Sequence, residues 1–311
     1  MAILDFYKTF PDEESCKTRW KEIRIKQGVV CPRCGHKEHY WKKDKECFEC
    51  KHCHYRQSLR ANTIMHGSQL SFRTWFIAFH LLTSTKKSFS ALWMQQQLGH
   101  KNYKPIWAML HKIRSAMGHR DDRYMLHDAL EMDEGFFSTE ASEADKSEPR
   151  KRGRGSQRKS MVLVMAESLP SDNSGSSRGR KPTASRYLKM KQIPDLGRET
   201  VANNVIEHID PSSRIVTDCY SSYKQLKDLV REHEAHVSSK ETVAKVLPWV
   251  HIAISNAKRL ITDVYHDIRP EYLQYYLDEF CYKFNRRYFK ERLFDRLLIA
   301  GVDFKKEFKY A

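Results

Sequence analysis

Between Ser71 and Met117 the apolar residues recur at the spacing of α-helices. Apolar positions three and four apart line one side of a helix, which predicts a buried face for the first stretch. A short helix ending at Leu98 follows, with Gly99 as its stop, and then a longer helix with Pro105 in its first turn. The expected buried positions are Phe72, Trp75, Phe76, Phe79 and Leu82 in the first helix, and Ile106, Met109, Leu110 and Ile113 in the longest.

The order of a short helix, a glycine turn and a longer helix fits a helix-turn-helix, which places its second helix in the major groove of DNA. A plain helical bundle that links two domains has the same order, so the pattern alone leaves both interpretations open. Basic side chains on the turn and the longer helix favour DNA contact, and these are Lys101, Lys104, Lys112 and Arg114.

After Tyr124 the pattern changes to strands. The near-continuous apolar run Ser160–Leu169 is typical of a central strand, and Ala129–Phe137 and Ser185–Ile193 are its expected neighbours. A helical stretch begins at Arg198, and a short strand ends at Asp218. This order predicts an α/β domain with one mixed sheet.

Two loops rich in Pro, Gly and Ser interrupt the strands, at 146–160 and 170–185. The first is strongly basic, which suits phosphate contacts, although a solvated hairpin tip is an equal alternative. Its candidate DNA-binding residues are Arg150, Lys151, Arg152, Arg154 and Arg158.

Charge narrows the class of partner. The 311 residues include 55 Lys and Arg against 39 Asp and Glu, a formal net charge of +16. Such a balance favours a polyanion such as nucleic acid, or else a merely soluble basic protein. The sequence contains no apolar run long enough to span a membrane and no signal peptide pattern, which argues against a membrane or exported protein.

Five of the eight cysteines fall between Cys31 and Cys53. Two C-x-x-C pairs, Cys31 with Cys34 and Cys50 with Cys53, predict one structural Zn²⁺ in a zinc ribbon, because each pair directs two thiolates at one ion. Cys47 also precedes Cys50 by three, so a Cys47/Cys50 pair is an alternative second knuckle. Four thiolates already close the site, which leaves out the nearby His36, His39, His52 and His54.

Two aspartates stand at informative places. Asp133 lies inside an apolar strand, where a carboxylate is costly unless it is paired or bound to metal. Asp218 ends a short strand before a turn, a usual position for a site residue in an α/β fold. Either acid alone is more often a cap or an ion-pair partner, but together they predict a two-metal phosphoryl-transfer site.

The order of these segments along the chain resembles that of a known family. The order of the zinc ribbon, "FRTWFIAFHLL", "LGHKNYKPIWAMLHKIRSAM", "EMDEGFF", "IVTDCYSSY", "NAKRLITDVYH" and "YLQYYLDEFCYKFNRR" is similar to bacterial insertion-sequence transposases of the DDE class. More narrowly, the chain looks like the zinc-ribbon-headed, ISXO-like group related to eukaryotic Merlin elements, over 15–287. The resemblance implies an RNase H-like core in which Asp133 and Asp218 bind two Mg²⁺ or Mn²⁺.

The same resemblance implies a function and partners. Such enzymes bind terminal inverted repeats in double-stranded DNA, cut the element free and join its ends to target DNA. We therefore expect a cytoplasmic, nucleoid-associated bacterial protein that is at least a homodimer when active. Strand alternation turns Glu134 to the face opposite Asp133, whereas Glu131 shares the Asp133 face.

The third ligand departs from the family pattern. In many relatives it is Glu, seven residues before a Lys; here the Lys is Lys258, and His251 occupies the Glu position. On a helix His251, Ser255 and Lys258 share one strip with Thr262, and Asn256 lies about 140° from His251. Imidazole suits Mn²⁺ better than Mg²⁺. His251 as ligand, Asn256 as ligand and a degraded site all remain open.

The expected domains are an N-terminal helical segment at 1–24, the zinc ribbon at 25–62, the helix-turn-helix region at 63–123, the catalytic domain at 124–290 with a basic loop insertion at 138–160, and a C-terminal tail at 291–311. Two other functions remain possible on these residues: a catalytically inactive, domesticated DNA-binding regulator, and a zinc-ribbon nuclease that processes RNA.

Overall fold

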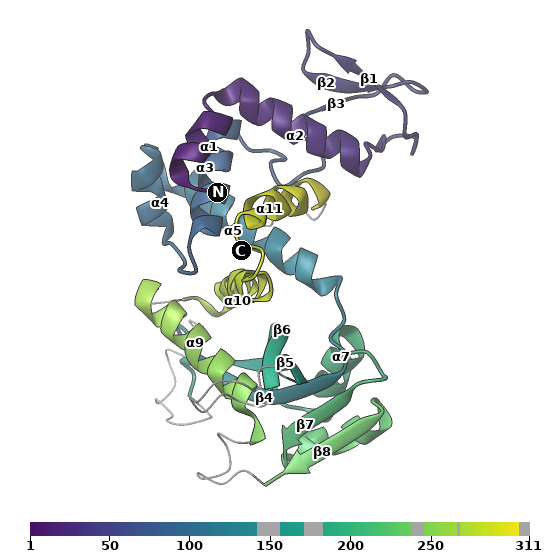
Figure 1. Cartoon of the computed structure of the whole chain (residues 1–311), viewed down its shortest axis with the longest axis vertical. Coiled ribbons are helices and arrows are strands. Elements are labelled where there is room, and N and C mark those ends of the chain that lie inside the picture. The colour runs from purple at the N-terminus through teal and green to yellow at the C-terminus, as the bar shows by residue number, and fades with distance from the viewer. Residues whose placement is uncertain (142–155, 171–182, 238–245, 266–267, 305–311) are drawn as a thin grey trace. The chain divides into compact units, whose positions relative to one another are not determined.

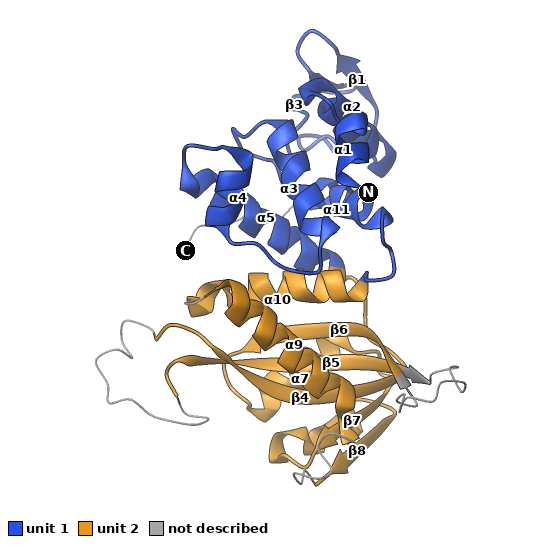
Figure 2. Cartoon of the chain, turned by 60° about the vertical axis from the view of Figure 1, so that its left-hand side comes forward, with its two compact units in different colours: residues 1–120, 286–311 blue, residues 121–285 orange. Residues whose placement is uncertain are grey.

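The computed structural model describes residues 1–141, 156–170, 183–237, 246–265 and 268–304 (Figure 1). The chain divides into two compact units, Met1–Arg120 with Arg286–Ala311, and Asp121–Asn285 (Figure 2). Among the helices of the described residues, none is long and apolar enough to cross a membrane.

Unit 1 is a helical cluster that carries a small sheet. The Trp20 indole is fully buried at its centre and stacks on the Phe79 ring at 6.3 Å between centroids. The segment expected as a C-terminal tail contains a helix that packs against two others, because its apolar face needs cover. The helices are α1 (Ile3–Thr9), α2 (Glu13–Gln27), α3 (Phe72–Ser84), α4 (Ala91–Leu98), α5 (Tyr103–Asp122) and α11 (Arg292–Asp303).

The three helices expected between 71 and 117 are confirmed. Ser71 and Ser90 cap the starts of α3 and α4 by accepting backbone N–H bonds, and Gly99 ends α4 in a left-handed conformation. Every apolar residue expected to be buried in α3 and α5 is buried. The order α4, turn and α5 matches a helix-turn-helix, and whether it reads DNA stays a prediction.

The small sheet is an antiparallel ribbon of β1 (His39–Lys42), β2 (Cys47–Cys50) and β3 (Arg56–Ser58), in that order. The buried Arg24 of α2 fastens it, since its guanidinium donates to the carbonyls of Ser58 and Leu59, both at 2.9 Å. The ribbon is therefore seated on α2.

Unit 2 contains a five-stranded sheet in the order β6-β5-β4-β7-β8. The first three strands along the chain pair antiparallel, and β7 and β8 run parallel to β4. The strands are β4 (Ala129–Ser138), β5 (Lys159–Pro170), β6 (Thr183–Ile193), β7 (Arg214–Asp218) and β8 (Glu232–His236).

Helices cover both faces of this sheet, as Figure 1 shows. One core packs α9 (Pro248–Val264) and α10 (Pro270–Asn285) on residues such as Phe137 and Val164. The other packs α7 (Arg198–His208) and the 3-10 helix η2 (Ser221–Asp228) on residues such as Met132. Strand order, strand directions and two covered faces confirm the mixed α/β, RNase H-like architecture.

Candidate metal centres and DNA-contacting residues

The four cysteines predicted as zinc ligands come together. Their sulfur atoms all lie within 4.8 Å of one another, with Cys31 Sγ 3.6 Å from Cys53 Sγ and Cys34 Sγ 3.6 Å from Cys50 Sγ. A tetrahedral Zn²⁺ with Zn–S bonds of 2.3 Å separates its sulfurs by about 3.8 Å. The donor set and its spacing therefore fit a structural zinc ion.

Each C-x-x-C pair is shaped by the same backbone turn. Gly35 N–H donates to the Cys31 carbonyl at 2.9 Å, and His54 N–H donates to the Cys50 carbonyl at 3.1 Å. Both donors have positive φ, +74° for Gly35 and +55° for His54. Glycine adopts this conformation freely, and histidine is among the other residues that adopt it most often.

The structure separates Cys47 from this cluster. Cys47 is buried in β2, where it pairs with Lys42 and Ser58 of the neighbouring strands. Among the described residues, the cysteine cluster comprises Cys31, Cys34, Cys50 and Cys53 only. The geometry favours Cys50 with Cys53 as the second knuckle.

In unit 2 the two predicted aspartates also come together. Carboxylate oxygens of Asp133, Glu134 and Asp218 all lie within 4.8 Å of one another. Ligands of one octahedral Mg²⁺ with bonds of 2.0–2.1 Å stand about 3–4 Å apart, so small side-chain rotations bring these oxygens onto one ion. The cluster fits a hard divalent cation.

Strand register explains the meeting of Asp133 and Asp218. The parallel ladder of β4 and β7 pairs Glu131 with Val216, and two further steps set Asp133 beside Asp218, where β7 ends. Beyond this point β4 continues to Ser138 without a partner on that side. The open edge leaves room for carboxylates next to the last turn of β7.

The prediction that Glu134 points to the face of the strand opposite Asp133 is confirmed, although its carboxylate still lies near that of Asp133. The Glu134 backbone does face the η2 side, where Tyr223 O–H donates to Glu134 Oε2 at 3.0 Å. Because β4 has no neighbour at this position and Glu has two methylene groups, its carboxylate still approaches those of Asp133 and Asp218. Strand alternation fixes Cβ direction and not the end of a long side chain.

Three carboxylates in a buried site disfavour full ionisation. Burial, together with the charges of Glu134 and Asp218, raises the pKa of Asp133 from 3.8 to about 7. Burial and the same carboxylates also raise the pKa of Tyr223, so its hydroxyl stays a hydrogen-bond donor. A bound cation relieves this repulsion, which is the electrostatic reason to expect one here.

His251 lies next to this cluster. It belongs to α9, and its Nδ1 is 3.7 Å from Asp133 Oδ2 with one third of its side chain exposed. The core-facing arc expected for this helix is confirmed, since Ala253, Ile254 and Ala257 are buried. Asn256, the alternative ligand, is exposed on the same helix. The geometry favours His251.

Two turns further along α9, Lys258 extends the same strip. Its ammonium lies 5.6 Å from the centroid of the Phe137 ring on β4. Burial and the nearby charge of Lys159 lower the pKa of Lys258. Two cations therefore lie near the ends of β4 and β5 that are close to Phe137, where they could contact a phosphate.

Gly135 lies under α9, between Asp133 and Phe137 on β4. A Cβ atom there would lie 3.0 Å from the Phe137 ring, which is crowded, and 3.4 Å from Ile254 Cγ1 of α9, which is at the edge of ordinary contact. The missing side chain therefore leaves room for the Phe137 ring in the core that β4 shares with α9.

The predicted DNA-contacting residues divide into two groups. Lys101, Lys104 and Arg158 are exposed, whereas the Lys112 ammonium donates to the His66 carbonyl at 2.7 Å. Arg114 is 2% exposed and donates to the Phe89 carbonyl, so the prediction of a DNA-facing role for it is wrong. Arg150, Lys151, Arg152 and Arg154 lie outside the described residues.

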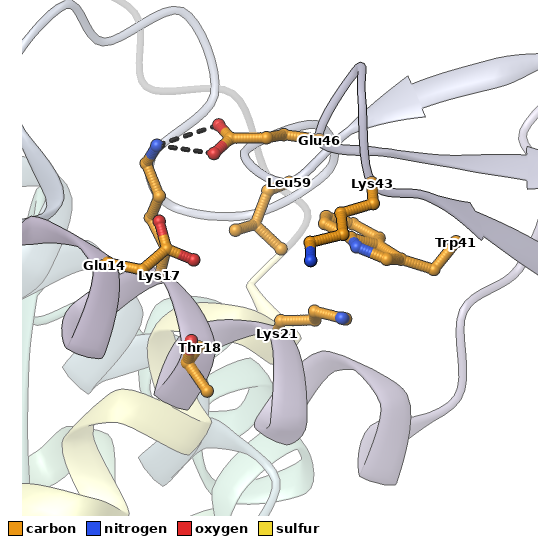
Figure 3. A pocket seen from close by; sticks show the side chains of 8 residues that line it. All are labelled: Glu14, Lys17, Thr18, Lys21, Trp41, Lys43, Glu46 and Leu59. Carbon is orange, nitrogen blue, oxygen red and sulfur yellow. Dashed lines mark hydrogen bonds and ion pairs between the residues drawn. The ribbon is translucent and has the colours of Figure 1, made fainter.

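The sequence reasoning missed a basic cleft in unit 1. A cleft of about 580 Å³ lies between α2 and the zinc ribbon, and Figure 3 shows Lys21 and Trp41 pointing into it. The Lys21 ammonium is 4.2 Å from the Trp41 ring centroid, and Lys17 forms an ion pair with Glu46 at 2.8 Å. These residues lie far apart in sequence, so no spacing rule could have found them.

A candidate zinc ribbon on a helical unit, followed by an RNase H-like domain with a carboxylate cluster that could hold a metal ion, is the combination expected of a metal-dependent nucleic-acid enzyme. The family comparisons are specific. Residues 125–285 match the model of the ISXO2-like transposase domain, and residues 11–56 match that of the transposase zinc-ribbon domain. The chain belongs to the ISXO2-like transposase family.

Solved structures give a distant likeness. A pre-cleavage Mos1 transpososome matches with a TM-score of 0.30 and 13% identity, over 75% of this chain and 80% of that chain. The Mos1 transposase paired-end complex with left transposon end matches with a TM-score of 0.29 and 12% identity, over 74% and 80%. No curated protein matches this chain.

Proposed function

We propose that this transposase binds the terminal inverted repeats of a mobile element, cleaves the element ends and joins them to target DNA. The observation that carries the proposal is the meeting of Asp133 and Asp218 on adjacent parallel strands, with carboxylate oxygens within 4.8 Å. A divalent cation bound between these carboxylates would relieve their mutual repulsion.

Asp133, Asp218 and His251 are the proposed ligands of two Mg²⁺ or Mn²⁺ ions. Bound divalent ions supply an activated nucleophile and stabilise the leaving oxygen in phosphoryl transfer. His251 adds a neutral nitrogen, which shifts the preference toward Mn²⁺. Glu134, held by Tyr223, adds a carboxylate on the other side of the cluster.

Lys258 is the proposed contact to the scissile phosphate. Its ammonium lies on the same helical strip as His251, above Phe137. A cation placed there holds the DNA backbone against the carboxylates, which repel it. The exposed Lys101, Lys104 and Arg158 are proposed to bind backbone phosphates further from the reaction.

Site-directed variants test this function. Asp133→Ala or Asp218→Ala should reduce strand cleavage by at least about a thousandfold, since metal charge stabilisation supplies several kcal/mol. Cleavage is measured on an oligonucleotide duplex with a repeat end, and binding to the same duplex should survive. Unchanged cleavage in both variants contradicts the proposal.

The His at the third position favours one alternative, an inactive DNA-binding regulator. Nicking of the repeat-end duplex by the wild-type chain in Mg²⁺ or Mn²⁺ separates the two functions, because a regulator binds the duplex without cutting it. An RNA-processing nuclease would instead cut the matching RNA and join no strands. Active complexes are proposed to be at least dimeric, which sedimentation with repeat-end DNA tests.

A further inference from the structure

We propose that Glu131 is a positioning residue: it caps helix α9 from strand β4 and thereby holds His251 at the metal site. The proposal rests on the function proposed above and adds a residue to it. Glu131 Oε2 accepts hydrogen bonds from the backbone N–H groups of Trp249 at 2.7 Å and Val250 at 3.1 Å. His251 is the next residue of the helix.

The start of α9 needs such a partner. The first turn of a helix leaves N–H groups without an intrahelical acceptor, and a side chain at the N-cap usually accepts one. Here the N-cap is Leu247, whose side chain cannot accept, and Pro248 has no N–H to donate. The Trp249 and Val250 groups remain, and Glu131 accepts both.

The next N–H of the turn is also accounted for, because His251 N–H donates to the Leu247 carbonyl at 3.3 Å. The helix therefore begins on a carboxylate supplied by the strand and not by its own sequence. A carboxylate suits this place, since the N-terminal end of a helix carries partial positive charge. Glu131 is 7% exposed, so water does not compete freely for the same bonds.

The geometry links the cap to the metal site directly. Glu131 and Asp133 lie two residues apart on β4 and so face the same side, toward α9. One strand thus supplies both a proposed metal ligand and the anchor of the helix that bears another. With the helix start fixed to β4, His251 Nδ1 stands 3.7 Å from Asp133 Oδ2.

Burying a second carboxylate near Asp133 has an electrostatic cost, which a purely structural cap could avoid. A Ser or Asp at position 247 would cap the helix as well, but it would leave the helix free to shift along the strand. Glu131 fixes the position of α9 relative to Asp133. This is the property that a third metal ligand requires.

The test compares Glu131→Ala, Glu131→Asp and Glu131→Gln in the full chain, with Mn²⁺ as the probe. The amide oxygen of Gln still accepts both N–H bonds, Asp is too short to reach them, and Ala has no acceptor. The matched control is Glu167→Ala: Glu167 is also buried, accepts the His127 N–H at 3.2 Å and pairs through β5 with Leu130.

The main readout is the nitrogen coupling of bound Mn²⁺ in electron spin-echo spectra, with His251→Ala as the reference for its loss. Wild type, Glu131→Gln and Glu167→Ala should show the coupling, and Glu131→Ala and Glu131→Asp should lose it. Mn²⁺ affinity should fall about tenfold or more in those two, as for other groups that orient a metal ligand.

The outcomes are distinct. Full coupling in Glu131→Ala, or equal behaviour of Glu131→Asp and Glu131→Gln, overturns the positioning role and leaves the proposed function intact. Absence of coupling in wild type with Mn²⁺ bound overturns His251 as a ligand and this inference with it. If Glu131→Ala does not fold, the Asp and Gln pair decides alone, since both retain a polar side chain at this position.

Discussion

The two candidate metal centres are built in opposite ways. The cysteine site takes all four ligands from one short segment, Cys31 to Cys53, and two backbone turns arrange them. The carboxylate site takes its residues from β4, β7 and α9, which are distant in sequence. The first site is local, and the second exists only once the sheet and its covering helix are in place.

This difference decides what each site depends on. The ribbon has little apolar core, so its metal is expected to supply much of its folding free energy. The RNase H-like sheet has large cores on both faces, so it is expected to fold without metal and to hold the carboxylates against their own repulsion. Metal supports the fold in one unit, and the fold supports the metal site in the other.

The largest expected effect is loss of the ribbon on Cys50→Ser. Structural zinc binding is worth about 10–16 kcal/mol in small zinc domains, so removing one thiolate should release the ion and unfold β1 to β3. Zinc content by atomic absorption and amide exchange of the ribbon strands measure this. Mn²⁺ binding at Asp133 and Asp218 should be unchanged, because that site has its own core.

Cys47→Ser is the matched control for that variant. Cys47 is buried, as Cys31 and Cys50 are, but lies outside the cluster of proposed zinc ligands. The variant should keep its full zinc content and lose only about 1 kcal/mol of stability, the cost of placing a hydroxyl in an apolar site. Loss of zinc from Cys47→Ser would return Cys47 to the ligand set.

A smaller effect, below that expected for loss of either aspartate, is expected for His251. His251→Ala removes one proposed ligand and leaves the carboxylates, so cleavage should fall about a hundredfold, less than for loss of an aspartate. His251→Glu should restore activity in Mg²⁺, because a carboxylate suits that ion better than imidazole. Cleavage rates across a Mg²⁺ and Mn²⁺ series measure both. If His251→Ala leaves the cleavage rate unchanged, the third ligand is Asn256 or the site has no third ligand.

The pH dependence of stability should also distinguish the two sites. The pKa of Asp133 is raised from 3.8 to about 7, so the folded chain keeps a proton that the unfolded chain has lost between these values. The metal-free protein should therefore lose stability as pH rises from about 4 to 7, by at most about 1.4 kcal/mol per pH unit. Thermal unfolding with and without Asp133→Asn measures this slope, which the variant should remove.

Metal binding at the carboxylates should follow the opposite trend. Below pH 7 a cation must displace the Asp133 proton, so Mn²⁺ affinity should rise by up to about tenfold per pH unit until about pH 7. Titration of Mn²⁺ binding by calorimetry at several pH values tests it. An affinity independent of pH in this range would contradict the raised pKa.

Sequence reasoning reached the two sites unequally for the same structural reason. The spacing predicted Cys31, Cys34, Cys50 and Cys53, since a C-x-x-C turn is defined by neighbouring residues, and only the place of Cys47 needed the structure. The strands, the helical faces and the mixed sheet followed from periodicity. The roles of Glu134 and Glu131 did not, because they depend on an open strand edge and on a helix start far away in sequence.

The predicted DNA contacts of two basic residues failed for a similar reason: they depend on groups that are distant in sequence. Arg114 and Lys112 lie on a helix with the right spacing, yet their side chains turn back to the carbonyls of Phe89 and His66. The charged end of a Lys or Arg side chain can donate a hydrogen bond to a backbone carbonyl that lies near it in the fold. The sequence alone does not show which carbonyl lies near. The cleft between α2 and the ribbon was not predicted, because the residues that line it come from separate segments of the sequence.

The smallest predicted effect tests whether the fold positions the carboxylate site, and it is Gly135→Ala. The new methyl group would stand 3.0 Å from the Phe137 ring, so that ring must give by a few tenths of an ångström, whereas the 3.4 Å to Ile254 Cγ1 is at the edge of ordinary contact. Overpacking of this kind costs about 1–2 kcal/mol, which lowers the melting temperature of unit 2 by a few degrees. Because Phe137 belongs to the same apolar core as α9, its displacement should also disturb the helix that carries His251, so Mn²⁺ affinity should fall while zinc content stays the same. Ser138→Ala, at the exposed end of the same strand, is the control and should change neither. A stable Gly135→Ala variant with normal Mn²⁺ affinity would mean that the packing of this core does not set the position of His251.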